Sequence, residues 1–239
     1  MKKCLNGVLG SRMFGSLATA VASASISLLA TTAAFATNFS FDGTFTRDDD
    51  VQLFSFTADG SSTVRLISYS YGGGTQTNGT VVPAGGFDPI LALFDSSGNL
   101  VGQDDDAVSG TPGACGSGVV NPDPITNNQW DTCLDLALSA GNYKVAIMQY
   151  NNFANGPTLA DGFSASGSNF TGALGGCSNG QFCDVSGNPA GNNRTNAWAF
   201  DILNVSTAVE EGVPEPATLG LIGLGLAGLG FVRRRRAAA

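Results

Sequence analysis

The stretch Asn142-Tyr-Lys-Val-Ala-Ile-Met-Gln-Tyr150 decides the fold class of this chain. In an extended backbone, where side chains alternate between two faces, Tyr143, Val145 and Ile147 fall on the same face. Aromatic and β-branched residues are also enriched in strands. The stretch therefore predicts a β-strand with one face directed toward a hydrophobic core.

The same alternation recurs along the chain. Further segments of this type start at Val51, Ser62, Asp88, Asp131 and Asn196. Turn-forming residues such as Gly, Asn, Asp and Ser separate them. The pattern predicts an all-β domain at residues 37–209, an antiparallel β-sandwich of about eight strands with a jelly-roll-like arrangement.

Two departures from regular alternation are expected. In the segment from Val51, the apolar residues change face between Leu53 and Phe54, which predicts a β-bulge. Three insertions, at 72–86, 108–128 and 151–193, interrupt the strands. The third is long for a structureless loop, so we expect it to contain short strands near its centre, at 162–170.

The N-terminus has the features of a secretory signal peptide. Basic residues, the last of them Arg12, precede an apolar stretch at 14–35. Ala34 and Ala36 give the small-residue pattern of a cleavage site. We therefore expect residues 1–36 to be removed during export.

The C-terminus carries a motif, an apolar run and a basic tail. The motif consists of Val213, Pro214, Glu215 and Pro216 and lies in a linker at 210–216. Residues 217–232 contain no charge, and four arginines open the tail at 233–239. A helix of that length spans about 24 Å, somewhat less than a bilayer core, so the run predicts a short transmembrane helix. A buried helix of a globular domain is the alternative, but such a helix would not end in clustered arginines.

These three features, in this order, resemble the PEP-CTERM sorting signal of Gram-negative bacteria. The resemblance implies that an exosortase processes the chain at the motif and that the chain is anchored transiently in the inner membrane. It also implies a setting of exopolysaccharide and biofilm at the cell surface. Because basic flanks stay on the cytoplasmic side, the segment between the two apolar ends is expected outside the inner membrane.

Composition limits the functions of the exported part. Residues 37–216 hold four basic residues against nineteen acidic ones, a net charge of −15, which disfavours nucleic acid as a partner. The chain has no histidine, so the usual Ser/His/Asp and Cys/His nucleophile arrangements are excluded. We expect a protein that is not an enzyme. A glycosidase built on paired carboxylates is the alternative, and no single feature of the sequence marks one.

Four cysteines remain once Cys4 leaves with the signal peptide. An even number in an oxidising compartment predicts disulfides. Of the three connectivities, proximity in sequence favours Cys115 with Cys133 and Cys177 with Cys183. A zinc site formed by all four is the alternative, although paired C-x-x-C units are missing.

Two acidic triplets are candidate metal ligands. They are Asp48, Asp49 and Asp50 before one predicted strand, and Asp104, Asp105 and Asp106 after another. Adjacent carboxylates repel one another, and Ca²⁺ with oxygen ligands would neutralise them; Asp88 and Asp95 could add ligands. Solvated charge that protects a sheet edge, or local turns, is the alternative. Tyr69, Tyr71, Tyr150 and Phe153 could stack on sugar rings, or pack within the sheets.

Three segments resemble the bacterial pre-peptidase C-terminal domain. They are DVQLFSFT at 50–57, GFDPILALFDSSGNLVGQDDDA at 86–107 and LSAGNYKVAIMQY at 138–150. The resemblance covers roughly residues 48–150, with 198–205 as a closing strand. It implies a β-sandwich that accompanies secreted enzymes or surface proteins as a non-catalytic module.

The sequence thus predicts a secreted structural or interaction protein of the cell surface or extracellular matrix, with an exosortase and extracellular polysaccharide as partners. A calcium-dependent carbohydrate-binding module is the alternative function, motivated by the acidic triplets and the tyrosines.

Overall fold

A computed structural model of the chain describes residues 36–165, 169–185 and 192–212. The predicted signal peptide, apart from Ala36, lies outside the described residues. The motif at 213–216, the predicted transmembrane helix at 217–232 and the basic tail also lie outside them. Within the described ranges, no helix has the length and apolar character needed to cross a membrane.

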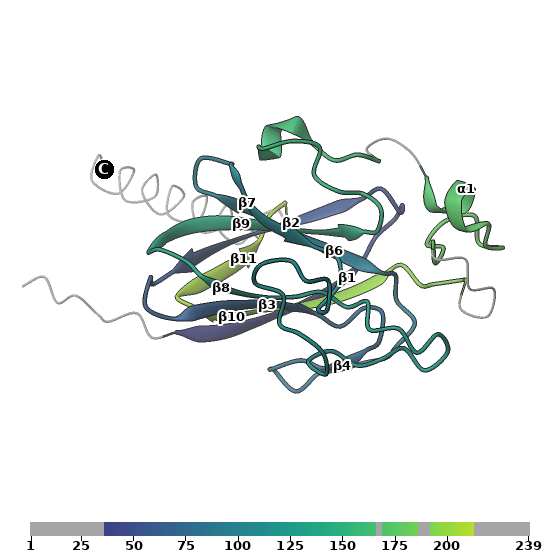
Figure 1. The fold of residues 1–239 in the computed structure, drawn as a ribbon, viewed down its shortest axis with the longest axis horizontal. Helices are drawn as coiled ribbons and strands as arrows, with labels where there is room; N and C mark the ends of the chain where they lie inside the picture. Colours follow the sequence, from purple (N-terminus) through teal and green to yellow (C-terminus); the bar gives the residue numbers. More distant parts are fainter. Residues whose placement is uncertain (1–35, 166–168, 186–191, 213–239) are drawn as a thin grey trace, which may run out of the picture. The chain divides into compact units, whose positions relative to one another are not determined.

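Two antiparallel sheets form the body and lie as two layers (Figure 1). The first sheet has the order β1 (Thr37–Thr44), β10 (Ala197–Val205), β3 (Thr63–Ser68) and β8 (Cys133–Ala137). The second has the order β11 (Thr207–Glu210), β2 (Val51–Ala58), β9 (Gly141–Gln149), β6 (Pro89–Asp95) and β7 (Leu100–Asp104). The predicted all-β, antiparallel architecture is confirmed.

The core lies between the two sheets, as the alternation predicts. Val145 and Ile147 of β9 meet Trp198, Phe200 and Ile202 of β10 in one buried cluster. Their inward faces follow the period of two read from the sequence. At roughly 25 cal/mol per Å² of buried apolar area, this shared cluster is the main force that holds the two layers together.

The predicted bulge in β2 is wrong. Residues of β2 pair with those of β9 without a register shift, from Val51 opposite Met148 to Ala58 opposite Gly141. Phe54 faces the core between the sheets, whereas Leu53 packs against a second cluster on the outer face of the same sheet. The outer face of β2 begins with Val51 and Leu53, which pack against this outer cluster, and continues with polar Ser55 and Thr57. The apolar pair is therefore explained by cover over the first half of the strand, and the backbone does not need to change face.

The third insertion provides that cover. The segment after β9 contributes Phe153, Leu159 and Phe163 to the outer cluster and runs over the five-stranded sheet (Figure 1). It contains a short 3-10 helix, η1 (Leu159–Asp161), and a five-residue helix, α1 (Thr171–Gly175). Among its described residues, the only sheet-like pairing near the expected strands is a bridge between Ala154 and Phe163. The strands expected at 162–170 are not found in the described part of that segment.

The other insertions are also structured. The first forms a small hairpin, β4 (Gly74–Thr75) with β5 (Val81–Val82). The second is tied to β8 by the disulfide between Cys115 and Cys133. The disulfide between Cys177 and Cys183 closes a loop in the third. Both pairings agree with those that sequence proximity favours.

A buried arginine joins the second and third insertions to the residue that precedes the first. Arg194 pairs with Asp123 at 2.8 Å and lies 3.5 Å from Asp184, and its guanidinium stacks on the ring of Tyr71 at 3.7 Å. The Tyr71 ring in turn packs against Trp130, with 5.1 Å between the ring centres. This contact helps to fix the position of Trp130.

Candidate functional site

The carboxylates of the first acidic triplet make hydrogen bonds and an ion pair with other groups of the protein. Asp48 accepts hydrogen bonds from the backbone N–H groups of Phe170 (3.1 Å) and Thr171 (2.9 Å), and also from the Thr171 hydroxyl. Asp49 pairs with Arg47 at 2.6 Å. Asp50 accepts two backbone N–H groups at 2.8 Å each, from Thr46 and Arg47. These contacts anchor α1 and shape the turn before β2.

The second triplet divides between two roles. Asp104, the last residue of β7, is buried and accepts a hydrogen bond from the Ser109 hydroxyl at 2.9 Å. Asp105 and Asp106 are only partly buried and open onto a surface pocket. Of these three adjacent carboxylates, Asp105 and Asp106 therefore line one pocket, whereas Asp104 does not.

Antiparallel pairing brings further residues to this pocket. Asp88 precedes β6 and Tyr150 follows β9, and the backbone N–H of Tyr150 donates to the carbonyl of Asp88 at 2.8 Å. Because β6 also pairs with β7, the start of β6 lies beside the end of β7, where Asp105 and Asp106 follow. Asp95 lies at the other end of β6, where it caps the turn to β7.

The chain before β8 completes the pocket with Trp130. Asp131 anchors this segment because its buried carboxylate accepts hydrogen bonds from the Ser68 hydroxyl at 2.8 Å and from the backbone N–H of Gly72 at 2.7 Å. The Thr132 hydroxyl donates to the carbonyl of Pro89 at 2.7 Å. The pocket has a volume of about 200 Å³. Its walls are Asp88, Asp105, Asp106, Trp130, Tyr150 and Val185.

The pocket is strongly acidic. Burial, together with the neighbouring charges of Asp105 and Asp104, raises the pKa of Asp106 to about 7. Burial and the charges of Asp106 and Asp105 raise the pKa of Asp88 well above its usual value. Asp88 is 7% exposed, and its Oδ1 atom has no hydrogen-bond partner in the described part of the chain. A buried carboxylate oxygen without a donor is uncommon, because removing it from water has a cost.

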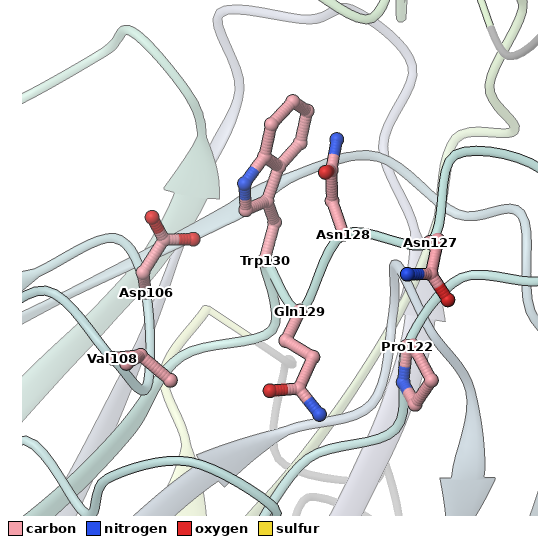
Figure 2. Close-up of a pocket in the computed structure, with 7 residues that line it drawn as sticks. All are labelled: Asp106, Val108, Pro122, Asn127, Asn128, Gln129 and Trp130. Carbon is pink, nitrogen blue, oxygen red and sulfur yellow. The ribbon is translucent and has the colours of Figure 1, made fainter.

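A second, larger pocket of about 480 Å³ adjoins the first and shares Asp106 and Trp130 with it. Figure 2 shows Asp106 and Val108 on one side of the Trp130 ring and Asn127, Asn128 and Pro122 on the other. Gln129 lies below the ring (Figure 2). Side-chain amides both donate and accept hydrogen bonds, so this extension suits a polar, uncharged ligand surface.

Sequence reasoning found the acidic part of this site and missed its aromatic and amide part. Trp130 follows the polar end of the second insertion, where the sequence has no strand periodicity, and only the fold brings it beside Asp106. Of the four aromatic residues proposed for stacking, Tyr150 lines the acidic pocket, whereas Tyr71 is fully buried beneath Arg194. A tryptophan preceded by Asn127, Asn128 and Gln129 was the available signal.

The predicted calcium site remains a prediction. Among residues 36–165, 169–185 and 192–212, no three or more Asp, Glu, His or Cys side chains gather as a metal-binding group. The first triplet is not part of the acidic pocket, and its carboxylates already accept protein hydrogen bonds.

Comparison with known proteins identifies the C-terminal signal. The family model of the PEP-CTERM protein-sorting motif matches residues 212–236. No curated protein matches the chain. The matched segment covers the predicted motif, apolar run and arginines, and begins directly after the last described strand and Glu211. The match indicates an exported protein whose processing partner is an exosortase.

Proposed function

We propose that this protein is exported, processed by an exosortase at the motif formed by Val213 to Pro216, and serves as a non-enzymatic interaction protein of the cell surface or extracellular matrix. Its partner would be extracellular polysaccharide. The sorting motif at 212–236, joined to a β-sandwich with an acidic and aromatic surface site, carries the proposal. Transient anchoring of residues 217–232 in the inner membrane belongs to the same proposal.

The sandwich topology supports a module of the pre-peptidase C-terminal type. The three segments that resemble that family correspond to β2, to β6 with β7, and to β9, which lie side by side in one sheet. With the β4–β5 hairpin set aside, successive strands alternate between the sheets except for β6 and β7, which are neighbours in one sheet, and the order is that of two interlocked Greek keys. This order is the jelly-roll arrangement, with β11 added beside β2.

Processing can be tested with a tag placed after Arg236. We expect the surface-exposed form to have lost the tag and the inner-membrane form to retain it. A Glu215→Ala variant should accumulate with the tag attached, whereas Glu210→Ala, outside the matched motif, should be processed normally. A tag still present on the surface form would contradict the proposal.

A matrix role requires binding of polysaccharide without cleavage. The purified full chain should co-sediment with exopolysaccharide from the native organism and should produce no new reducing ends during prolonged incubation. Release of reducing ends, abolished in Asp106→Asn, would instead support a glycosidase.

A calcium-dependent carbohydrate-binding module is the second candidate, favoured by the three carboxylates that line one pocket. Thermal melting with EDTA, with Ca²⁺, and with Ca²⁺ plus polysaccharide tests it. A melting temperature that Ca²⁺ raises, and that polysaccharide raises further only in the presence of Ca²⁺, would favour this candidate.

A further inference from the structure

The acidic pocket lacks a basic partner from the chain itself. The four basic residues of residues 37–212 all pair elsewhere: Arg47 with Asp49, Arg65 with Asp135, Lys144 with Glu211, and Arg194 with Asp123. Asp88, Asp105 and Asp106 therefore share a partly enclosed space without a cation from these side chains. Carboxylates gathered in this way are stabilised most by a ligand that carries positive charge.

The Oδ1 atom of Asp88 points to the same conclusion independently. It is buried at the pocket wall, and none of the described residues donates a hydrogen bond to it. A donor is therefore missing at a buried carboxylate that lines the pocket. An ammonium group offers three donors and one positive charge, which fits an orphan acceptor flanked by two further carboxylates.

The rest of the lining favours an organic cation with a flat face. Trp130 and Tyr150 border the same space, and aromatic faces attract cations and stack on the C–H faces of sugar rings. The volume of about 200 Å³ is several times the roughly 30 Å³ that one water occupies in the liquid, so it accommodates a group of several heavy atoms.

The adjoining pocket indicates a ligand longer than one unit. It continues past Trp130 over Asn127, Asn128 and Gln129, whose amides suit hydroxyl and acetamido groups. A polymer with alternating amine and hydroxyl functions would occupy both pockets at once.

We infer that the pocket of Asp88, Asp105 and Asp106 binds the protonated amine of an amino sugar within a polysaccharide, with Trp130 as the stacking surface for its ring. This inference rests on the proposed polysaccharide-binding function and names the class of polymer: a hexosamine chain with free amino groups. Asp88 accepts the buried hydrogen bond, Asp105 and Asp106 supply most of the charge at the pocket mouth, and the amides beyond Trp130 hold the next unit.

Titration calorimetry of the full chain with three hexasaccharides tests the inference: β-1,4-linked glucosamine, N-acetylglucosamine and glucose. We expect the glucosamine oligomer to bind at least about tenfold more tightly than the other two, because only it carries the amines that make charge-assisted hydrogen bonds. Its affinity should fall as salt rises. Equal affinity for the three oligomers would overturn the inference.

Variants separate the site from the general negative charge of the protein. Asp106→Asn and Trp130→Ala should each weaken glucosamine-oligomer binding by about tenfold or more. Asp42→Asn removes the same charge from an exposed position on β1 and should leave binding unchanged. Circular dichroism confirms folding, and Asp105→Asn replaces Asp106→Asn if that variant does not fold. Wild-type affinity in both pocket variants would refute the assignment.

Further measurements distinguish direct recognition of the amine from recognition through a metal, and separate this inference from the proposed function. Binding that disappears with EDTA and returns with Ca²⁺ would mean that a metal bridges ligand and carboxylates, and would overturn direct recognition of the amine. A protein that is processed at its motif and co-sediments with exopolysaccharide, yet shows no preference for free amines, would refute this inference and leave the proposed function intact. Amine-selective binding by a protein that is never exported would refute the function instead.

Discussion

Arg194 shows how a single buried charge can organise polar insertions. Its guanidinium is almost completely enclosed, stacked on Tyr71 and paired with Asp123. Although burial of the guanidinium opposes its charge, the hydrogen bond to Asp123 and the neighbouring Tyr71 keep the pKa of Arg194 above its usual value. This one side chain therefore contacts Tyr71, the second insertion at Asp123 and the third insertion at Asp184.

Replacing Arg194 with Met should destabilise the protein by about 3–5 kcal/mol, because the carboxylate of Asp123 is left buried without its partner. The measurement is chemical denaturation of the full chain. Arg65→Met is the matched control, since the ion pair of Arg65 with Asp135 is partly exposed and should contribute less than about 1 kcal/mol. Equal losses in the two variants would show that the buried pair has no special role.

Asp59 makes a residue-scale contribution that depends on pH. Its carboxylate accepts the backbone N–H groups of Ser61 and Ser62 in the turn between β2 and β3, which lowers the pKa of Asp59 to about 2. Because the folded-state pKa lies below the unfolded one, the stabilising effect is present above about pH 4 and is lost as the pH falls toward about 2.

An NMR titration of Asp59 should therefore give a midpoint well below that of an unfolded peptide. In an Asp59→Asn variant, the stability difference from the wild type should shrink as the pH falls through this range. A midpoint near 4 for Asp59 would mean that the turn hydrogen bonds are weak in solution.

At the scale of elements, β6 is buried on both faces, and β9 is buried on both faces over its second half. Phe94 of β6 lies in the outer cluster, whereas Leu93 beside it faces the core between the sheets. A two-layer sandwich leaves the outer face of each sheet in water, but here the segment after β9 covers one of them. The sandwich is therefore thickened on one side by an irregular segment.

A Phe94→Ala variant tests whether the segment after β9 packs on the outer face of the five-stranded sheet. Phe94 is fully buried in the outer cluster, so truncation should cost about 3–5 kcal/mol, as for a core phenylalanine. Val101→Ala on β7 is the control, because Val101 is 45% exposed and its loss should be small. A Phe94→Ala protein as stable as the wild type would mean that the covering segment does not pack on the sheet in solution.

Some of these elements could be read from the sequence and others could not. β9 and β10 were predictable because alternating apolar residues on one face directly report burial. β7 was not predictable from alternation because its sequence, LVGQD, has few apolar residues. It forms an edge strand of its sheet. In β2, the apolar neighbours Leu53 and Phe54 wrongly predict a bulge, because one sequence cannot reveal that a distant segment of the chain packs over Leu53.

The candidate site was also only partly predictable from the sequence. Asp105 and Asp106 stand out as adjacent charges, but their meeting with Asp88 depends on the β6–β7 pairing. Trp130 reaches them through its contact with Tyr71, a tertiary interaction without a local signature.

At the scale of the whole molecule, the two expected processing sites lie just outside the sandwich. β1 begins at Thr37, immediately after Ala36, and β11 ends at Glu210, shortly before Val213. Beyond the predicted domain end at 209, Glu211 still pairs with Lys144 and its backbone N–H donates to the carbonyl of Leu53. Trimming at both sites would therefore leave every strand of the described residues in place.

Intact-mass measurement of the protein released from the cell surface tests this arrangement. We expect a chain that starts at Thr37, ends within residues 213–216 and is four hydrogen atoms lighter than its reduced form, because two disulfides are closed. Alkylation should modify all four remaining cysteines only after reduction. In cells that lack the exosortase, the mass should include residues 217–239, which serves as the control. A surface form that retains Met1 or carries free thiols would contradict export through an oxidising compartment, since cytoplasmic proteins keep their thiols reduced.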